Sequence, residues 1–599
     1  MEVPEFMTMN FSFWYTLAII IIMTIALVRE LFEPELTVFS ALLLLVLGHV
    51  ITTREALAGF SNSGMLTVGF LFIVADAIKQ TGLLNRISVL LLGKSKQGIT
   101  QKLLRLIFPV ASFSAFFNNT PIVAMLIPVI HSWTKNHDYA ISKFLIPLSY
   151  ATILGGMCTL IGTSTNLVVH GLMIESGIEG MSFFELMKIG LPAALFGILY
   201  IAFIGHRLLP DRKEPIAELG ENTREYVVEL KVEPNYQHIG RSIEEAGLRH
   251  LKGLFLFQIE RHGQILAPVG PNETIQLGDR LFFIGLPATI IELQKTPGLS
   301  VIKDTKFDLK NYDSDKIKAF EVVISPSSPL KGINVRDSNF RSRYQAVILA
   351  IHRNGERIQK KIGDIVLRPG DTLLILARHD FLKKWYHSNE FNLVSEAENI
   401  PSKPKRYAYM SLTIFVFMIC FMALEVIPIV FSAAIAAVML IFSKCISPTD
   451  AQKSVQWNVL LIIASALGIS HALDNSGVAR FLAEKLIDSV GSFGPVAILA
   501  SIYFLTSFYT EFITNNAAAA LVFPIGFAAA HQVGLDPRPF ALAVAIGASA
   551  SFATPIGYQT NLMVYGPGGY KFNDYLKIGI PLNLLVGLIV ILMIWFWYF

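Results

Sequence analysis

The feature that most constrains this chain is a series of apolar segments, each long enough to cross a lipid bilayer, which takes about 20 residues. With 53% hydrophobic and only 16% charged residues, the chain has too few charges to coat a soluble surface, which usually takes about 25%. We therefore predict a polytopic α-helical membrane protein. The expected spans lie near residues 12–28, 34–51, 64–80, 142–172, 184–205, 407–424, 428–443, 457–473, 538–566 and 576–598.

A charged segment divides the apolar segments into two groups. Residues 211–406 are one third of the chain but carry more than half of its Asp, Glu, Lys and Arg residues. The first apolar run, which follows Glu2 and Glu5, shows no cleavage site and is expected to stay as an extra span. The predicted division is membrane block 1 (1–209, the extra span plus repeat 1), two soluble domains (210–300 and 301–406) and membrane block 2 (407–599).

The two membrane blocks are internal copies. Three short segments of the first block recur in the second in the same order and at nearly the same separation: 161–166 (IGTSTN) in 556–561 (IGYQTN), 188–192 (KIGLP) in 577–581 (KIGIP), and 117–120 (FNNT) opposite 513–516 (ITNN). Two shorter apolar stretches, 107–132 and 495–530, have polar residues in the middle and indicate re-entrant hairpins. We expect inverted repeats, the design of secondary transporters, with about eleven transmembrane helices.

Basic residues flank the soluble block on both sides and set the expected orientation. They favour a cytoplasmic location for that block, within a multi-pass protein of the plasma membrane or, in a prokaryote, the inner membrane. These residues are His206, Arg207, Arg212 and Lys213 before the block, and Lys403, Lys405 and Arg406 after it.

The soluble block is itself doubled. Gly278 and Asp279 of the first copy recur as Gly370 and Asp371 of the second, and each copy has three apolar strand-like segments. The tight turns fall at His262-Gly263 and Asn354-Gly355, of which the second is a strong hairpin signal. We expect two small α/β domains.

Four polar interruptions of apolar segments have the chemistry that an anion carrier needs. They are 118–121 (NNTP), 514–516 (TNN), 162–166 (GTSTN) and 553–561 (ATPIGYQTN), and none contains Lys or Arg. In a broken helix, N-terminal amides can face an anion, while carbonyl and amide oxygens hold Na⁺. Packing motifs or loops between ordinary helices are the alternative for any single interruption, but less so for four that pair across a repeat. Glu511 is an ion ligand, a proton site or, as we favour, a contact at the base of a hairpin.

The interruptions resemble those of the divalent anion/sodium symporter family over both membrane blocks. That family carries Ser-Asn-Thr at each hairpin tip and a Gly-Thr-x-x-Asn or Thr-Pro-x-x-Asn type break in the next helix; neither tip here is Ser-Asn-Thr. The resemblance implies substrate contacts from Asn118, Asn119, Thr120, Thr165, Thr514, Asn515, Asn516 and Thr560. It implies Na⁺ ligands from Asn119, Gly162, Ser164 and Asn166 in one half, and Asn515, Thr554, Gly557 and Asn561 in the other.

The expected function is sodium-coupled symport of a divalent anion, with sulfate favoured, by elevator-type alternating access in a homodimer; the last two properties are implied by the resemblance alone. Where dicarboxylate carriers of the family tend to have Gly-Thr-Pro-Pro-Asn, residues 162–166 read Gly-Thr-Ser-Thr-Asn. The alternatives are a sodium- or proton-coupled dicarboxylate carrier and, in other classes, a ligand-gated ion channel or a membrane-bound sensor. Na⁺ is the expected coupling ion. We expect no enzyme activity, no organic cofactor and no nucleic-acid partner.

The soluble copies resemble the C-terminal domain of potassium-conductance regulators, called RCK-C or TrkA-C. That resemblance implies dimerisation and, in some members, a small regulatory ligand. No Gly-x-Gly-x-x-Gly fingerprint precedes either copy, so the nucleotide-binding half of such regulators is not expected. A dimerisation or trafficking scaffold without a ligand is the alternative, and it has at least the same weight as a ligand sensor.

Overall fold

The structure, a computed structural model, describes most of both membrane blocks and parts of the soluble block. The described residues are 10–29, 31–81, 98–137, 139–212, 227–248, 254–266, 269–270, 272–285, 296–302, 317–325, 328–353, 356–358, 360, 362–378, 380–385, 390–393 and 404–599. Glu2, Glu5, Lys213, Lys403 and the turn at Asn354-Gly355 lie outside them.

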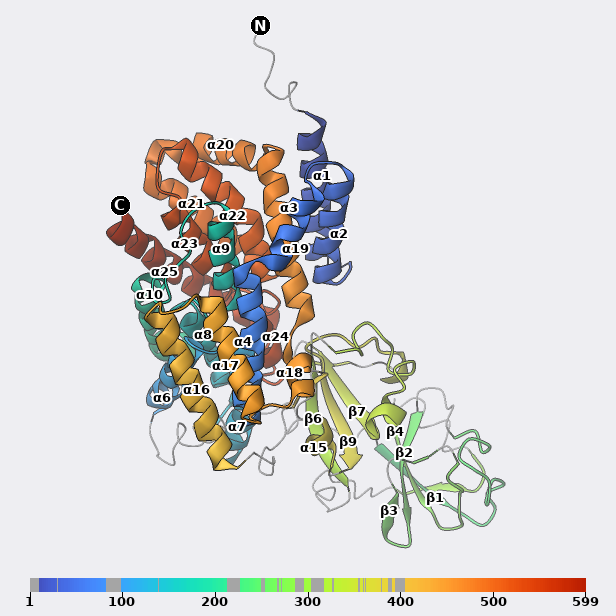
Figure 1. Cartoon of the computed structure of the whole chain (residues 1–599). Helices are drawn as coiled ribbons and strands as arrows, with labels where there is room; N and C mark the ends of the chain where they lie inside the picture. Colours follow the sequence, from blue (N-terminus) through green and yellow to red (C-terminus); the bar gives the residue numbers. More distant parts are fainter. Residues whose placement is uncertain are drawn as a thin grey trace.

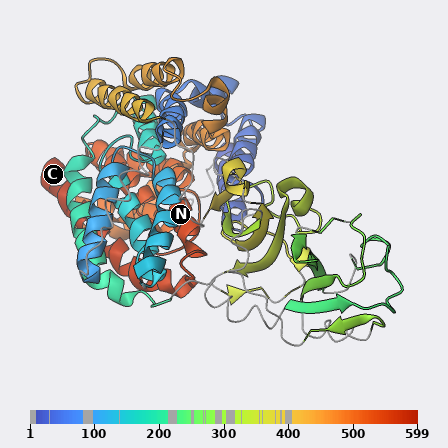
Figure 2. The same cartoon turned by 90° about the horizontal axis from the view of Figure 1, so that it is seen from below.

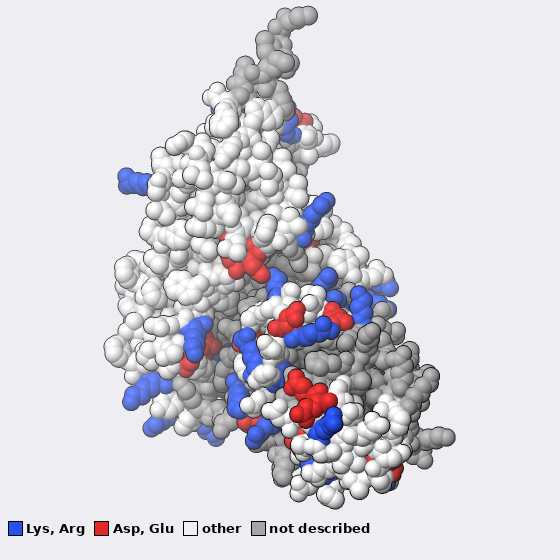
Figure 3. Space-filling view, turned by 90° about the vertical axis from the view of Figure 1, so that its right-hand side faces the viewer, with Lys and Arg blue, Asp and Glu red and all other residues white. Residues whose placement is uncertain are grey.

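The chain forms a helical body with two β-rich domains at one end (Figure 1). Seen from that end, the β-rich domains lie to one side of the helices (Figure 2). On the face shown in Figure 3, Lys, Arg, Asp and Glu are sparse over the helical body and gather toward the β-rich domains. This distribution suits a body surrounded by lipid.

Six of the described helical segments are long and apolar enough to cross a membrane. They are Phe11–Val28, Thr53–Gln80, Met187–Leu208, Lys405–Ala423, Trp457–Asn475 and Phe572–Tyr598. Shorter apolar helices lie between them. The chain is therefore a mostly helical, polytopic membrane protein.

The first half consists of three helical segments, a helical hairpin, a broken helix and a last helix. The helices are α1 (Phe11–Val28), α2 (Pro34–Leu47), α3 (Thr53–Ala58), α4 (Ser63–Gln80), α6 (Ile99–Ser114), α7 (Asn119–His137), α8 (Leu145–Gly156), α9 (Ser164–Glu175), α10 (Met187–Tyr200) and α11 (His206–Leu208). A π-helical turn, Ile201–Gly205, joins the last two.

The second half repeats this order, with one further helix, α20, between α19 and the hairpin. Its helices are α16 (Lys405–Ala423), α17 (Ile429–Phe442), α18 (Pro448–Ser454), α19 (Trp457–Asn475), α20 (Val478–Val490), α21 (Pro495–Thr510), α22 (Asn515–Gln532), α23 (Arg538–Ser549), α24 (Gln559–Tyr565) and α25 (Phe572–Tyr598). The contacts also repeat: α1 packs on α2 as α16 packs on α17, and α2 packs on α19 as α17 packs on α4. The first helix thus packs in its half as α16 packs in the other.

The soluble block forms two five-stranded sheets with the same topology. The first has the order β3-β2-β4-β1-β5 and the second the order β8-β7-β9-β6-β10. The strands are β1 (Val227–Val232), β2 (Leu254–Arg261), β3 (Gln264–Leu266), β4 (Arg280–Gly285), β5 (Leu299–Val301), β6 (Ile317–Ile324), β7 (Ala346–Arg353), β8 (Glu356–Arg357), β9 (Thr372–Arg378) and β10 (Phe391–Leu393). Short helices α14 (Phe340–Tyr344) and α15 (Phe381–Trp385) belong to the second copy.

One ion pair shows the duplication at atomic detail. The Arg261 guanidinium donates two hydrogen bonds to Asp279, at 2.8 and 2.9 Å. Arg353 does the same to Asp371, at 2.7 Å for each bond. Each aspartate also accepts a backbone N–H three residues before it. The recurring Asp therefore fixes the turn before the central strand in both copies.

The second soluble domain contacts the membrane helices. The carbonyl of Gly370 and the hydroxyl of Thr372 lie so close to Gly566 that a Cβ there would come within 2.9 and 2.2 Å of them. Lys331 forms a 2.9 Å ion pair with Glu33 before α2, and His131 of α7 lies 3.8 Å from Glu321 of β6. The turn at Gly370 thus rests at the end of α24.

Candidate functional site

Four segments meet inside the helical body. We call the ends of the hairpins tip 1 (residues 115–120, between α6 and α7) and tip 2 (residues 511–516, between α21 and α22). The loops in the broken helices are break 1 (residues 157–163, between α8 and α9) and break 2 (residues 550–558, between α23 and α24). Every predicted site residue lies in one of these segments or in the first turn of the helix that follows it.

Each tip is held by the same internal hydrogen bond. Ser114 donates its hydroxyl to Oδ1 of Asn119 over 2.7 Å. Thr510 donates its hydroxyl to Oδ1 of Asn515 over 3.0 Å. Both asparagines are the first residue of a helix, so the bond fixes the side chain at the start of α7 and of α22.

Each break is also held by one asparagine. Asn166 donates from Nδ2 to the carbonyls of Gly156 (3.2 Å) and Thr159 (2.8 Å). Asn561 donates to the carbonyls of Ser551 and Thr554, both at 3.1 Å. The same amide therefore spans the break in both halves and turns several backbone oxygens toward it.

Glycine makes the tight path of each break possible. A Cβ on Gly162 would lie 2.5 Å from the carbonyl oxygen of Gly156. On Gly557, it would lie 2.2 Å from the hydroxyl of Ser551 and 2.8 Å from the carbonyl of Thr510. The two glycines thus shape the breaks by their lack of a side chain.

The two halves are joined by crossed contacts between tips and breaks. Nδ2 of Asn119 donates to the Tyr558 hydroxyl over 2.6 Å, and Thr120 donates to Oε1 of Gln559 over 3.1 Å. In the other direction, Oδ1 of Asn516 accepts from Ser164 (3.3 Å) and Thr165 (3.2 Å). Each tip therefore meets the broken helix of the opposite half.

A third link joins α8 to α24. The Ser149 hydroxyl lies 2.9 Å from Oγ1 of Thr560 and 2.7 Å from Oδ1 of Asn561. Thr560, Asn561 and Asn166 are all fully buried. The predicted residues of break 2 thus also contact the first half.

Two buried oxygens at the site have no hydrogen-bond partner among the described residues. Oδ1 of Asn166 accepts no hydrogen bond from the described residues, although its side chain is fully buried. Oγ1 of Thr514 in tip 2 is likewise buried and has no hydrogen-bond partner among the described residues. An unpaired buried acceptor is costly, and an oxygen without a donor suits a cation ligand.

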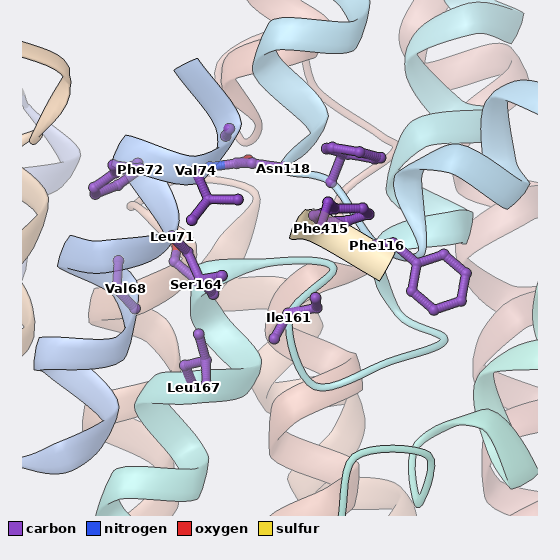
Figure 4. A pocket seen from close by; sticks show the side chains of 12 residues that line it. Val68, Leu71, Phe72, Val74, Phe116, Asn118, Ile161, Ser164, Leu167 and Phe415 are labelled. Atoms are coloured by element: carbon purple, nitrogen blue, oxygen red, sulfur yellow. The ribbon is translucent and has the colours of Figure 1, made fainter. Parts of the chain in front are cut away.

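A pocket opens beside tip 1 (Figure 4). Asn118 and Ser164 contribute polar groups to it, and Val68, Phe72 and Phe415 are among its apolar walls. The pocket brings tip 1, break 1, α4 and α16 together. The predicted residues thus lie in two places: Asn118 and Ser164 line this pocket, while Asn119, Thr165, Thr560 and Asn561 are buried in the contacts between halves.

Several residues at this site were not singled out from the sequence. Tyr558, Gln559 and Ser149 make contacts between the halves, and Ser114 and Thr510 fix the tips. A hydroxyl five residues before the central asparagine recurs in both tips, and that signal could have identified the last two. Nothing in the repeat pattern points to Ser149.

Glu511 of tip 2 is a buried acidic residue. Its carboxylate accepts hydrogen bonds from break 2 and from α25, so it does more than contact the base of the hairpin. Among the residues that the structure describes, no group of three His, Cys, Asp or Glu side chains could hold a metal ion. The candidate site consists of amides, hydroxyls and backbone carbonyls.

Comparisons with known proteins find transporters among the relatives of this chain. A family profile described as citrate transporter, CitMHS, matches residues 18–547. A putative sulfur deprivation response regulator of Chlamydomonas reinhardtii is 38% identical over 94% of this chain and 98% of its own length. An uncharacterized transporter of Synechocystis is 32% identical over 96% and 95%. Sodium/sulfate cotransporter 1 of Chlamydomonas reinhardtii is 27% identical over 91% and 85%.

Proposed function

Since this chain belongs to the citrate transporter family, CitMHS, we propose that it is a sodium-coupled symporter of a divalent anion, with sulfate as the favoured substrate. The observation that carries this proposal is the crossed meeting of tips and breaks, in which four polar segments without Lys or Arg, related by a repeat, share one buried region. Relatives named sodium/sulfate cotransporters support the choice of ions.

The anion is expected where the N-termini of three half-helices approach each other. The helices α7, α9 and α22 all begin at this region, and their terminal N–H groups carry partial positive charge. Asn118, Thr120 and Asn516 then supply side-chain hydrogen bonds. A binding site without Lys or Arg holds a dianion without a permanent buried positive charge in the empty carrier.

The sodium ions are expected at the breaks. In the first half, Oδ1 of Asn166 is available as a ligand, next to Asn119 and Ser164. In the second half, Asn515 and Asn561 occupy the matching positions, and Thr554, the counterpart of Thr159, is the further expected ligand. Bound Na⁺ places positive charge beside the anion and thereby couples the two.

The contacts among helices support alternating access. The helices α1, α2, α4, α16, α17 and α19 pack mainly on one another, whereas α6 to α10 pack with α21 to α25. The two groups meet mainly where α4 packs on α9 and α19 packs on α22, and α20 contacts both α19 and α22. We propose that the second group moves against the first, across the membrane, in a homodimer with cytoplasmic soluble domains.

Uptake of radiolabelled sulfate into proteoliposomes tests the proposal. A sodium gradient should drive accumulation, and replacement of Na⁺ by choline should stop it. The name of the family makes citrate the second candidate, so excess citrate or succinate is added as a competitor. Accumulation of sulfate without Na⁺, or of citrate in preference to sulfate, would contradict the proposal.

A current that needs no co-substrate would instead indicate a channel. The same liposomes, held at a set membrane potential without an anion gradient, separate the two classes. For a small molecule bound to the RCK-C-like domains, we propose only a regulatory effect on this uptake.

A further inference from the structure

Glu511 of tip 2 is a buried carboxylate that accepts hydrogen bonds from five neighbouring donors. Its side chain is 5% exposed. Oε1 accepts from two backbone N–H groups and one side-chain amide, and Oε2 from one N–H and one hydroxyl. In order, these donors are Phe552 (2.9 Å), Ala553 (2.8 Å), Asn583 (2.7 Å), Thr554 (2.8 Å) and Ser551 (3.2 Å).

The first half has the same backbone arrangement but no such carboxylate. The Thr554 hydroxyl donates to the carbonyl of Glu511 over 2.8 Å, and the Thr159 hydroxyl donates to the carbonyl of Ala115 in the same way. Ala115 is thus the repeat counterpart of Glu511. By the match of KIGLP with KIGIP, the counterpart of Asn583 is Ala194. The acid and the amide that binds it are present together in one half and absent together from the other.

The hydrogen bonds indicate the charge of Glu511. A protonated carboxyl would point its own hydrogen at one of the five donors, so the set of partners suits the ionised form. The group therefore adds one buried negative charge to break 2. It also occupies three consecutive N–H groups of that break, which makes them unavailable to an anion.

This charge lies next to the proposed cation ligands of the second half. Thr554 donates both its N–H and its hydroxyl to Glu511, while its carbonyl, like that of Ser551, accepts from Asn561. A carboxylate that orients and polarises a set of metal ligands raises their affinity for a cation, and loss of such a group typically lowers affinity about 10–100-fold.

We propose that Glu511 is a positioning residue that makes the second half the tighter of two unequal sodium sites. The inference rests on the proposed function and adds to it an order of binding: the site beside Glu511 fills at a lower Na⁺ concentration than the site beside Asn166. A merely structural Glu511 would hold break 2 in place without any effect on sodium affinity.

The test compares wild type with Glu511→Gln and Glu511→Asp. Sodium binding to purified protein in detergent is followed by the rise in melting temperature as Na⁺ replaces choline, a readout that does not depend on the identity of the anion. In Glu511→Gln the Na⁺ concentration for half of the stabilisation should rise about 10–100-fold. Glu511→Asp keeps the charge and should stay closer to wild type.

Asn583→Ala provides a milder variant in case Glu511→Gln does not fold. It removes one donor and keeps the carboxylate, so a smaller rise in the same direction is expected. Glu175→Gln is the charge-matched control, because Glu175 contacts His471 and Asn62 and lies outside the four segments.

An unchanged sodium titration in folded Glu511→Gln, or in Asn583→Ala where the first variant fails to fold, overturns the inference. It would leave the proposed function standing as long as uptake by wild type needs Na⁺. If wild type shows neither stabilisation by Na⁺ nor sodium-driven uptake, the proposed function fails, and the inference fails with it.

Discussion

The side-chain amide of Asn119 donates a 2.6 Å hydrogen bond to the hydroxyl of Tyr558, and this bond joins the first hairpin to the broken helix of the other half. Tyr558 also lies 3.3 Å from the Thr163 hydroxyl. One phenol thus connects tip 1, break 1 and break 2, the three segments whose relative position determines the candidate site.

Removal of the Tyr558 hydroxyl should weaken this junction. In Tyr558→Phe a buried amide loses its acceptor, so the protein should lose about 1–3 kcal/mol of stability and most of its uptake. The matched control is Tyr503→Phe, because the Tyr503 hydroxyl is equally buried but has no hydrogen-bond partner in the described part of the chain. Melting temperatures and uptake of the two variants are compared; equal behaviour would contradict the role of Tyr558.

The central asparagines of the two tips should be needed for transport. Asn119→Ala and Asn515→Ala each remove an oxygen that accepts a hydrogen bond from a hydroxyl. We propose this oxygen as a sodium ligand, so sodium-dependent uptake should fall to background. Membrane insertion, measured by yield and gel-filtration profile, should persist. Asn475→Ala changes an exposed asparagine that contacts Glu55 and serves as control. Full uptake by both tip variants would refute the site assignment.

The ion pair of Glu185 and Arg538 should make stability depend on pH. Burial raises the pKa of Glu185, but hydrogen bonds and the charge of Arg538 lower it more, so the pKa lies below its ordinary value of 4.5. A carboxyl with a lowered pKa in the folded state stabilises the protein above about pH 4.5, and this contribution is lost as the pH falls through the folded-state value.

Thermal unfolding of wild type and Glu185→Gln between pH 7 and pH 3 measures the effect. The variant should lose about 1.5–3 kcal/mol at pH 7, and the difference from wild type should shrink in acid. A difference that stays constant down to pH 3 would mean that the carboxyl does not carry the effect.

The contact between the second soluble domain and α24 should be sensitive to one methyl group. In Gly566→Ala the added carbon would meet Thr372 and Gly370, so the turn at Gly370 should be pushed away. Hydrogen exchange at residues 370–372 should become faster. The control is Gly270→Ala in the first soluble domain, where the structure leaves open space. Unchanged exchange in Gly566→Ala would contradict the contact.

The sequence predicted much of the architecture because the repeat is written in short motifs. Matching IGTSTN with IGYQTN identified both breaks, and apart from α20 the described helices follow one order in both halves. The motifs did not predict that α1 packs on α2 as α16 packs on α17. Repeat matching compares positions and carries no information on helix pairing.

The crossed contacts were beyond prediction for a related reason. A motif match shows that Asn119 and Asn515 are equivalent, but not that Asn119 reaches Tyr558 or that Asn516 reaches Ser164. Such proximity depends on how the two halves pack against each other. The five partners of Glu511 also come together only in the folded chain, because Asn583 is far from tip 2 in sequence.

The turn at Gly370 is set against Gly566, at the end of the helix that begins next to Thr560 and Asn561. If α24 shifts during a transport cycle, the second soluble domain must either move with it or lose this contact. Each transport cycle would then either break and re-form the contact between α24 and the second soluble domain, or move that domain together with the helix. The transport rate would therefore depend on the mobility of the second soluble domain, which is not part of the proposed ion sites.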